Sequence, residues 1–269
     1  TTGGGTLQVA SGISTGIWDG GGADNNWSTG GNWDQDSVPV FPIGLTFAGS
    51  TRLANNNDLS SITASSITFD AAAGAFVLGG NDITLSGNIG FNGNPAVPTT
   101  QTVNLNMTWN ADKTIDTPTN GNLTLGGNIT TAANTLTKVD AGTLTLGGVD
   151  GFSSYYLNGG TNIITGTTTI NGTDSGSYCY LGNSSAAYNG TLVIQPGAAF
   201  NITGNFGDAA VIGRNGGSGT VIQNGGTFTF NPANQTAMII GATGDSATRA
   251  EYDMNGGLLD MSGYTLAVG

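Results

Sequence analysis

The stretch that decides the fold is Ile212–Gly241, which reads IGRNGGSGTVIQNGGTFTFNPANQTAMIIG. It contains short runs in which apolar residues alternate with small or polar ones, and glycine-rich segments separate these runs. A period of two is typical of a β-strand, because successive side chains point to opposite faces. Glycine between the runs supplies the positive φ that a tight corner requires. The stretch therefore predicts three short strands in a unit of about 28 residues.

The pattern repeats through the C-terminal third of the chain, residues 181–269. Two corners of each unit are marked by glycine. They are Gly182, Gly213, Gly241 and Gly269 at the first corner, and Gly197, Gly225 and Gly256 at the second. This nearly constant spacing suits one turn of a solenoid, in which each turn covers the edges of its neighbour. The repeat favours an all-β parallel β-helix with three short strands per turn over a sandwich of antiparallel hairpins.

Alternating runs extend the same interpretation towards the N-terminus, as in Leu123-Thr124-Leu125 and Leu144-Thr145-Leu146. No charge block or linker divides the chain, so residues 1–269 are expected to form a single elongated domain. Residues 17–42 differ, because they hold three of the four tryptophans and two prolines. This Trp/Pro-rich block is expected either to cap the β-helix or to protrude from it.

Composition excludes several classes of protein. Only 8% of residues are charged and the net charge is −12, so neutralisation of a nucleic-acid backbone is excluded. No apolar run reaches the length of a membrane-spanning helix. Cys179 is the only cysteine, which rules out an intrachain disulfide and favours a buried small side chain. The start at Thr1, without Met, is that of a processed form or a segment of a longer chain.

The tryptophan block resembles the opening of bacterial proteins that carry autotransporter-associated β-strand repeats. The resemblance rests on Ile17-Trp18-Asp19-Gly20-Gly21-Gly22-Ala23-Asp24-Asn25-Asn26-Trp27-Ser28, followed by Gly31-Asn32-Trp33. Later segments such as Ala141-Gly142-Thr143-Leu144-Thr145-Leu146-Gly147-Gly148 are similar to that family's repeats. The resemblance implies a right-handed β-helix at a bacterial cell surface or in the medium, acting as a stalk, passenger or adhesin. It carries over no catalytic residue.

Residue types give little support to catalysis. Histidine is absent, and acidic residues lie near each other at Asp34 and Asp36 and in the neighbourhood of Asp19 and Asp24. Aspartate in Gly/Asn-rich corners normally accepts a hydrogen bond from its own turn. We therefore expect no enzyme activity, no metal site and no cofactor.

The tryptophans leave two interpretations open. Trp18, Trp27 and Trp33 either close one end of the core, which a solenoid needs, or offer exposed rings to a glycan. The first interpretation is favoured. The second makes the protein a surface adhesin or glycan-binding module with a polysaccharide partner.

The two ends of the chain predict how it assembles. The chain stops at Leu266-Ala267-Val268-Gly269, the first corner of a repeat, and Thr6-Leu7-Gln8-Val9 supplies the strand that would come next. A strand donated to a neighbour's last turn gives an open, head-to-tail filament. The candidate assembly residues are Thr6, Leu7, Val9, Leu266, Val268 and Gly269. The expected function is that of an extracellular structural protein, a stalk or filament subunit whose main partner is itself.

Overall fold

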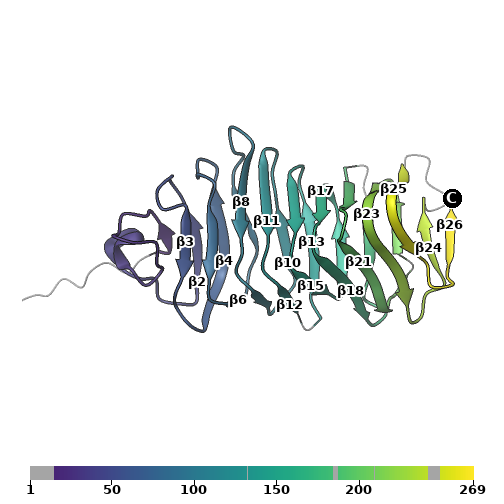
Figure 1. Ribbon diagram of the computed structural model, residues 1–269, viewed down its shortest axis with the longest axis horizontal. Coiled ribbons are helices and arrows are strands. Elements are labelled where there is room, and N and C mark those ends of the chain that lie inside the picture. Colours follow the sequence, from purple (N-terminus) through teal and green to yellow (C-terminus); the bar gives the residue numbers. More distant parts are fainter. Residues whose placement is uncertain (1–14, 132, 184–186, 209, 242–248) are drawn as a thin grey trace, which may run out of the picture.

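The protein forms a parallel β-helix in the computed structural model, which describes residues 15–131, 133–183, 187–208, 210–241 and 249–269. Every pairing between its named strands is parallel, and each strand pairs with the equivalent strand of the next turn. The turns stack into an elongated rod, with the tryptophan block at one end and β26 at the other (Figure 1). The prediction of an all-β parallel β-helix is confirmed.

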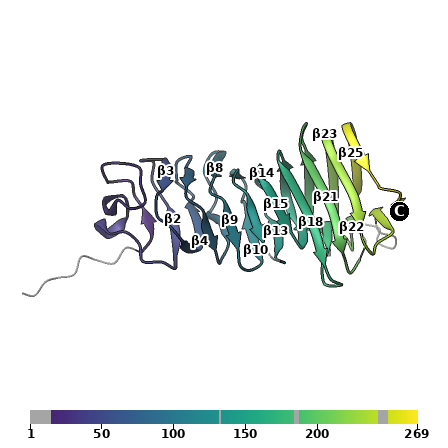
Figure 2. The same cartoon turned by 60° about the horizontal axis from the view of Figure 1, so that its bottom comes forward.

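The strands form three faces, which the chain follows in the order 1, 2, 3 in each complete turn (Figure 2). Face 1 contains β3 (Ala54–Asn57), β5 (Val77–Gly80), β8 (Thr99–Val103), β11 (Gly121–Leu125), β14 (Thr143–Leu146), β17 (Gly159–Ile164), β20 (Asn189–Ile194), and the first halves of β23 (Ser218–Pro232) and β25 (Ala250–Asp260). Face 2 contains the first half of β4 (Ile62–Asp70), β6 (Ile83–Leu85), β9 (Met107–Trp109), β12 (Ile129–Thr131), β15 (Val149–Phe152), β18 (Thr167–Thr173), β21 (Ala199–Asn205), and the second halves of β23 and β25. Face 3 contains β1 (Ile17–Trp18), β2 (Ile43–Phe47), the second half of β4, β7 (Ile89–Asn92), β10 (Lys113–Asp116), β13 (Thr135–Val139), β16 (Ser154–Leu157), β19 (Cys179–Asn183), β22 (Ala210–Arg214), β24 (Ala237–Ile240) and β26 (Thr265–Val268). Two short 3-10 turns, η1 (Gly30–Asn32) and η2 (Asp34–Asp36), are the only helical elements of the described residues.

The core lies inside the three faces and follows from the alternation seen in the sequence. Leu123 pairs with Leu144 and Leu125 with Leu146, and all four side chains are buried. The threonines between them point outward. Similar side chains stack on one another in successive turns, so the interior is packed continuously along the axis. Burial of apolar area is therefore the main contribution to stability.

The length of a turn varies along the rod although strands continue to pair in order. Thr143 pairs with Thr161, whereas Thr167 pairs with Ala199, so the second of these turns is much longer than the first. In the C-terminal third the turn has an intermediate length, as between Ala237 and its partner Thr265. β23 and β25 continue from face 1 into face 2, but the stretch of strand on each face stays short, so the corners absorb most of the difference.

The predicted corner glycines divide into two groups. Gly182, Gly213, Gly241 and Gly197 have φ values of 68°, 70°, 74° and 83°, in the left-handed region that favours glycine. The prediction is wrong for Gly225 and Gly256, because the left-handed residue is the following glycine in each case. At these corners two glycines stand in a row, and a Cβ on the second would collide with the carbonyl of the turn beneath. The two that take this conformation are Gly226 (φ 64°) and Gly257 (φ 87°).

Two lysines occupy core positions, which the sequence reasoning missed. Nζ of Lys113 donates to the carbonyl of Ser86, one turn earlier, at 3.1 Å and to that of Ala111 at 2.7 Å. Nζ of Lys138 donates to the carbonyl of Asp140 at 2.7 Å and to that of Gly159, one turn later, at 3.0 Å. Backbone carbonyls at the corners therefore replace water around each ammonium group and tie consecutive turns together.

Candidate functional site

The tryptophans Trp18, Trp27 and Trp33 form what we call the N-terminal cap, and all three are fully buried. Their rings meet edge to face, with centroid separations of 5.1 Å between Trp18 and Trp33 and 5.8 Å between Trp27 and Trp33. Phe47, the first phenylalanine of the core, packs against all three rings. No ring face is open to a sugar, so the assignment of these residues to glycan contact is wrong.

Hydrogen bonds hold the rings of the cap in place. Nε1 of Trp27 donates to Oδ1 of Asn55 at 2.9 Å, and Nε1 of Trp33 donates to the carbonyl of Trp27 at 2.7 Å. The intervening loop is fixed by Asn32, whose Nδ2 donates to two backbone carbonyls. Large aromatic surfaces, with the indole N–H groups of Trp27 and Trp33 satisfied, suit a lid on a solenoid core.

The opposite end of the rod has no such lid among the described residues. β25 and β26 form the C-terminal turn. Their inward-facing residues stack on the inward-facing residues of β23 and β24 and so continue the core. These side chains are open to solvent: Met254 is 48% exposed, Leu266 39% and Val268 74%. The outer edges of both strands pair with no other strand of the described structure. This end therefore presents an apolar surface and free backbone hydrogen-bonding groups.

The residues predicted to take part in assembly lie at this end and at the N-terminus. Leu266 and Val268 are on the C-terminal turn, and the Gly269 amide donates to the carbonyl of Ile240 at 3.0 Å. Thr6, Leu7 and Val9 lie outside the described residues. The structure therefore describes only Leu266, Val268 and Gly269 of this set, and the contact itself stays a prediction.

A lateral groove runs along the corner between faces 3 and 1, and we call it the axial groove. Two adjoining hollows of about 400 and 600 Å³ lie at this corner, and a third of about 290 Å³ adjoins them on the outside of face 3. Phe91 and Asp116 line the first and third hollows, while Asp140 and Ala141 line the first and second. The lining is polar: hydroxyl, amide and carboxyl groups outnumber apolar side chains.

Two carboxyl groups lie together in the middle of the axial groove. Asp116 ends β10 and Asp140 follows β13, so consecutive turns bring them close to each other. Burial, together with the neighbouring Asp140 carboxyl, raises the pKa of Asp116. The buried ammonium of Lys138 lies close by, and burial lowers its pKa to about 8. The sequence did not indicate this pair, because the turn that joins its members is shorter than the repeat recognised in residues 181–269.

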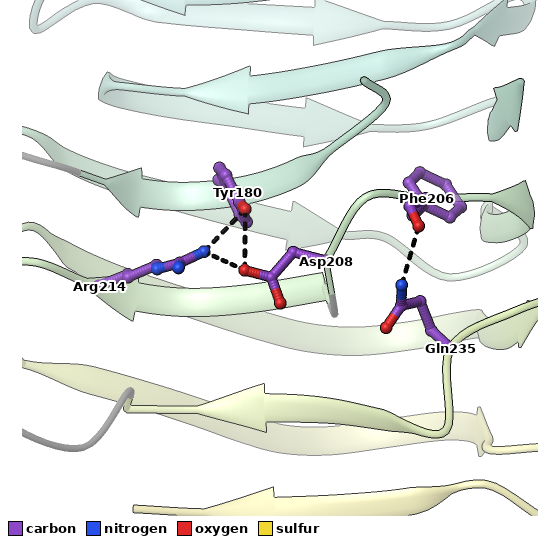
Figure 3. Close-up of polar contacts among 5 residues, drawn as sticks. All are labelled: Tyr180, Phe206, Asp208, Arg214 and Gln235. Carbon is purple, nitrogen blue, oxygen red and sulfur yellow. Dashed lines mark hydrogen bonds and ion pairs between the residues drawn. The ribbon is translucent and has the colours of Figure 1, made fainter. Parts of the chain in front are cut away.

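A second polar cluster lies on the outside of face 3 (Figure 3). The Arg214 guanidinium lies over the Tyr180 ring, 5.2 Å from its centroid, and donates to the Tyr180 hydroxyl at 2.7 Å and to Asp208. Nearby, Nε2 of Gln235 donates to the carbonyl of Phe206 at 2.8 Å. These contacts join β19, β22 and the segments beside them, so they stabilise the stacking of turns.

Other candidates have structural explanations. Cys179 is fully buried, and burial raises the pKa of its thiol to about 12, which makes it inert at neutral pH. Among the described residues, no group of three or more Cys, Asp or Glu side chains is arranged to hold a metal ion. No helix in this part of the chain is long and apolar enough to cross a membrane.

Comparison of the chain with protein-family models, with curated proteins and with solved structures found no match.

Proposed function

We propose that this protein is an extracellular structural element, a β-helix stalk or filament subunit whose C-terminal turn receives a strand from the next subunit. The observation that supports the proposal is the open C-terminal turn, where core positions are exposed and both strand edges lack a partner among the described residues. Unpaired edges of this kind are templates for a further strand. Repetition of the same contact between identical copies does not close, so it propagates as a filament.

The strand that fits this edge is proposed to be Thr6–Val9 of a neighbouring copy. An added strand must run parallel to β25 and place alternate apolar side chains inward, over the exposed core positions. Leu7 and Val9 have that spacing. The buried N-terminal cap rules out direct stacking of one described core on another at that end, so a donated segment is the route that remains.

An extracellular or bacterial cell-surface location belongs to the same proposal. It is supported by the resemblance to autotransporter-associated repeat proteins and by a surface rich in Thr, Asn and Gly but poor in Lys and Glu. The tryptophan-based adhesin alternative loses its support, because the three rings are inside the core.

Light scattering and electron microscopy of the purified chain test the proposal. We expect concentration-dependent fibres from the 269-residue chain, and monomers from a chain that lacks Thr1–Ser11 or carries Val268→Lys. Val149→Lys is the matched control, because Val149 is similarly exposed but points outward from the side of the rod. Fibres of normal length from the truncated chain, or loss of fibres in the Val149 variant, would contradict the proposed contact.

A further inference from the structure

We infer that the axial groove binds an extended, uncharged oligosaccharide whose hydroxyl groups donate to the carboxyl groups of Asp116 and Asp140. This inference does not depend on the stacking proposal, since the groove lies on the side of the rod and not at its end. The glycan site that it proposes is separate from the buried tryptophans.

The shape of the groove follows from the lengths of the corners. Where β7 passes to face 1, the corner contains the long segment Gly93–Pro98, whereas Asn158 alone separates β16 from β17. Short corners between longer ones leave a notch that runs parallel to the rod axis. Its lining extends from the corner after β7 to the corner before β20. These corners are four turns apart, which corresponds to about 19 Å along the rod axis. A notch of this length and volume accommodates several units of a linear polymer.

The two carboxyl groups differ from the other acids of the chain in what they bind. Most aspartates here are occupied by their own surroundings: Asp24, Asp112 and Asp174, for example, each accept a backbone N–H at 2.8–3.0 Å. Within the described part of the chain, no backbone N–H donates to the side chain of Asp116 or Asp140, and Oδ1 of Asp116 has no partner. Oδ1 of Asp116 is buried from solvent. The turn-forming role of Asp24, Asp112 and Asp174 does not account for this pair, whose carboxyl groups line the groove.

The charge of the lining selects the class of ligand. The three hollows are lined by two aspartates and by no lysine or arginine of the described residues. Because the whole chain carries a net charge of −12, a polyuronate or a sulfated glycan would be repelled. Hydroxyl donors from a neutral sugar avoid that repulsion and satisfy the carboxyl oxygens. The hydroxyls and amides of Thr119, Thr161 and Asn189 complete a hydrogen-bonding surface.

Aromatic rings lie near both ends of the groove. Phe91 is partly buried at the N-terminal side, and Tyr188 is 38% exposed at the C-terminal side. Rings in these positions can pack against the apolar faces of sugar units while the acids bind hydroxyl groups between them. An apolar contact at each end and acceptors in the middle suit a linear chain better than a compact ligand.

Titration of the whole chain with neutral oligosaccharides of four to eight units tests the inference. Cello-, xylo- and β-1,3-gluco-oligosaccharides are the probes, and calorimetry is the measurement. We expect saturable binding to at least one probe, at least tenfold weaker in Asp116→Asn and Asp140→Asn, and abolished in Ala141→Trp, which fills the groove without changing its charge. The matched controls are Asp82→Asn, at the corner between faces 1 and 2, and Ala111→Trp, at the corner between faces 2 and 3, and both should bind as wild type.

Several outcomes would overturn the inference. Absence of binding to every neutral probe would do so, as would binding that is unchanged in Ala141→Trp, because the site would then lie elsewhere. Preference for an oligogalacturonate would contradict the charge argument. Binding restricted to a chitosan oligomer would show that the pair recognises cations and not hydroxyl groups. A circular dichroism spectrum for each variant separates loss of binding from loss of fold.

Discussion

The two ends of this β-helix solve the same physical problem in opposite ways. At the N-terminal end three buried tryptophans cover the core, and their N–H groups and loops are mostly satisfied within the chain. At the C-terminal turn the core columns continue into solvent through Met254, Leu266 and Val268. The comparison teaches that a repeating turn leaves its own core positions open, and that at the N-terminal end a non-repeating sequence covers them.

The largest expected effect comes from opening the closed end. Trp27→Ala removes a ring with 0% exposure that contacts Trp33 and Phe47, so we expect a loss of about 3–5 kcal/mol in the free energy of unfolding. Leu266→Ala at the open end should cost about 1 kcal/mol or less, because much of that side chain is already in water. Urea denaturation of both variants makes the comparison. Equal losses would mean that the two ends are equally well packed.

A smaller difference is expected between corner glycines in the interior and at the open end. Gly182 and Gly241 both have positive φ, yet a Cβ at Gly182 would collide with the Ser218 backbone, while one at Gly241 would lie 3.6 Å from the Cβ of Ala250. We expect Gly182→Ala to cost about 2–4 kcal/mol and Gly241→Ala about 1 kcal/mol. Thermal unfolding followed by circular dichroism is the measurement. A Gly241 variant less stable than the Gly182 variant would contradict this reason. Close contact with the next turn would then not explain why these corners require glycine.

The turns between the ends should show an effect that depends on pH. Asp150 points into the core, its Oδ2 has no partner within the described structure, and burial raises its pKa to about 7. The folded protein therefore binds the proton more tightly than the unfolded chain, whose value is near 3.8. Stability should fall as the pH rises from about 4 to 7, by about 4 kcal/mol, since each pKa unit corresponds to about 1.4 kcal/mol.

Asp150→Asn provides the check on this pH dependence. The amide keeps the acceptor for the Ile129 amide, which donates to Oδ1 at 3.0 Å, and cannot ionise. The variant should be more stable than the parent at pH 8, and by a smaller margin at pH 5. Denaturation curves at the two pH values would contradict the assignment if the variant were less stable at both.

The sequence predicted those features that depend on local pattern. Leu144 and Leu146 are inside because alternation determines which face a strand residue occupies. The inward position of Lys138 was missed although its parity with Leu136 indicates it, because lysine is normally an outer residue. Its burial depends on carbonyls from a corner and from the next turn, which no local pattern describes.

The axial groove could not be predicted for a related reason. Asp116 and Asp140 meet only because the turn between β10 and β13 is shorter than the repeat that was readable in residues 181–269. Turn length varies along this chain, and no local sequence pattern indicates where it changes. Local pattern also fails to show which of two adjacent glycines takes the left-handed conformation, so Gly225 and Gly256 were assigned where Gly226 and Gly257 have it.

The variable length of the turns has a consequence for how such a molecule changes size. The turn from Thr143 to Thr161 is far shorter than the turn from Thr167 to Ala199, yet each advances the rod by one strand spacing, about 4.8 Å. Residues added at a corner therefore increase girth, and only a whole added turn increases length. The length of the rod is therefore proportional to the number of its turns. Its reach is set by how many turns are present, while its sides can be remodelled by insertion or deletion without altering that reach.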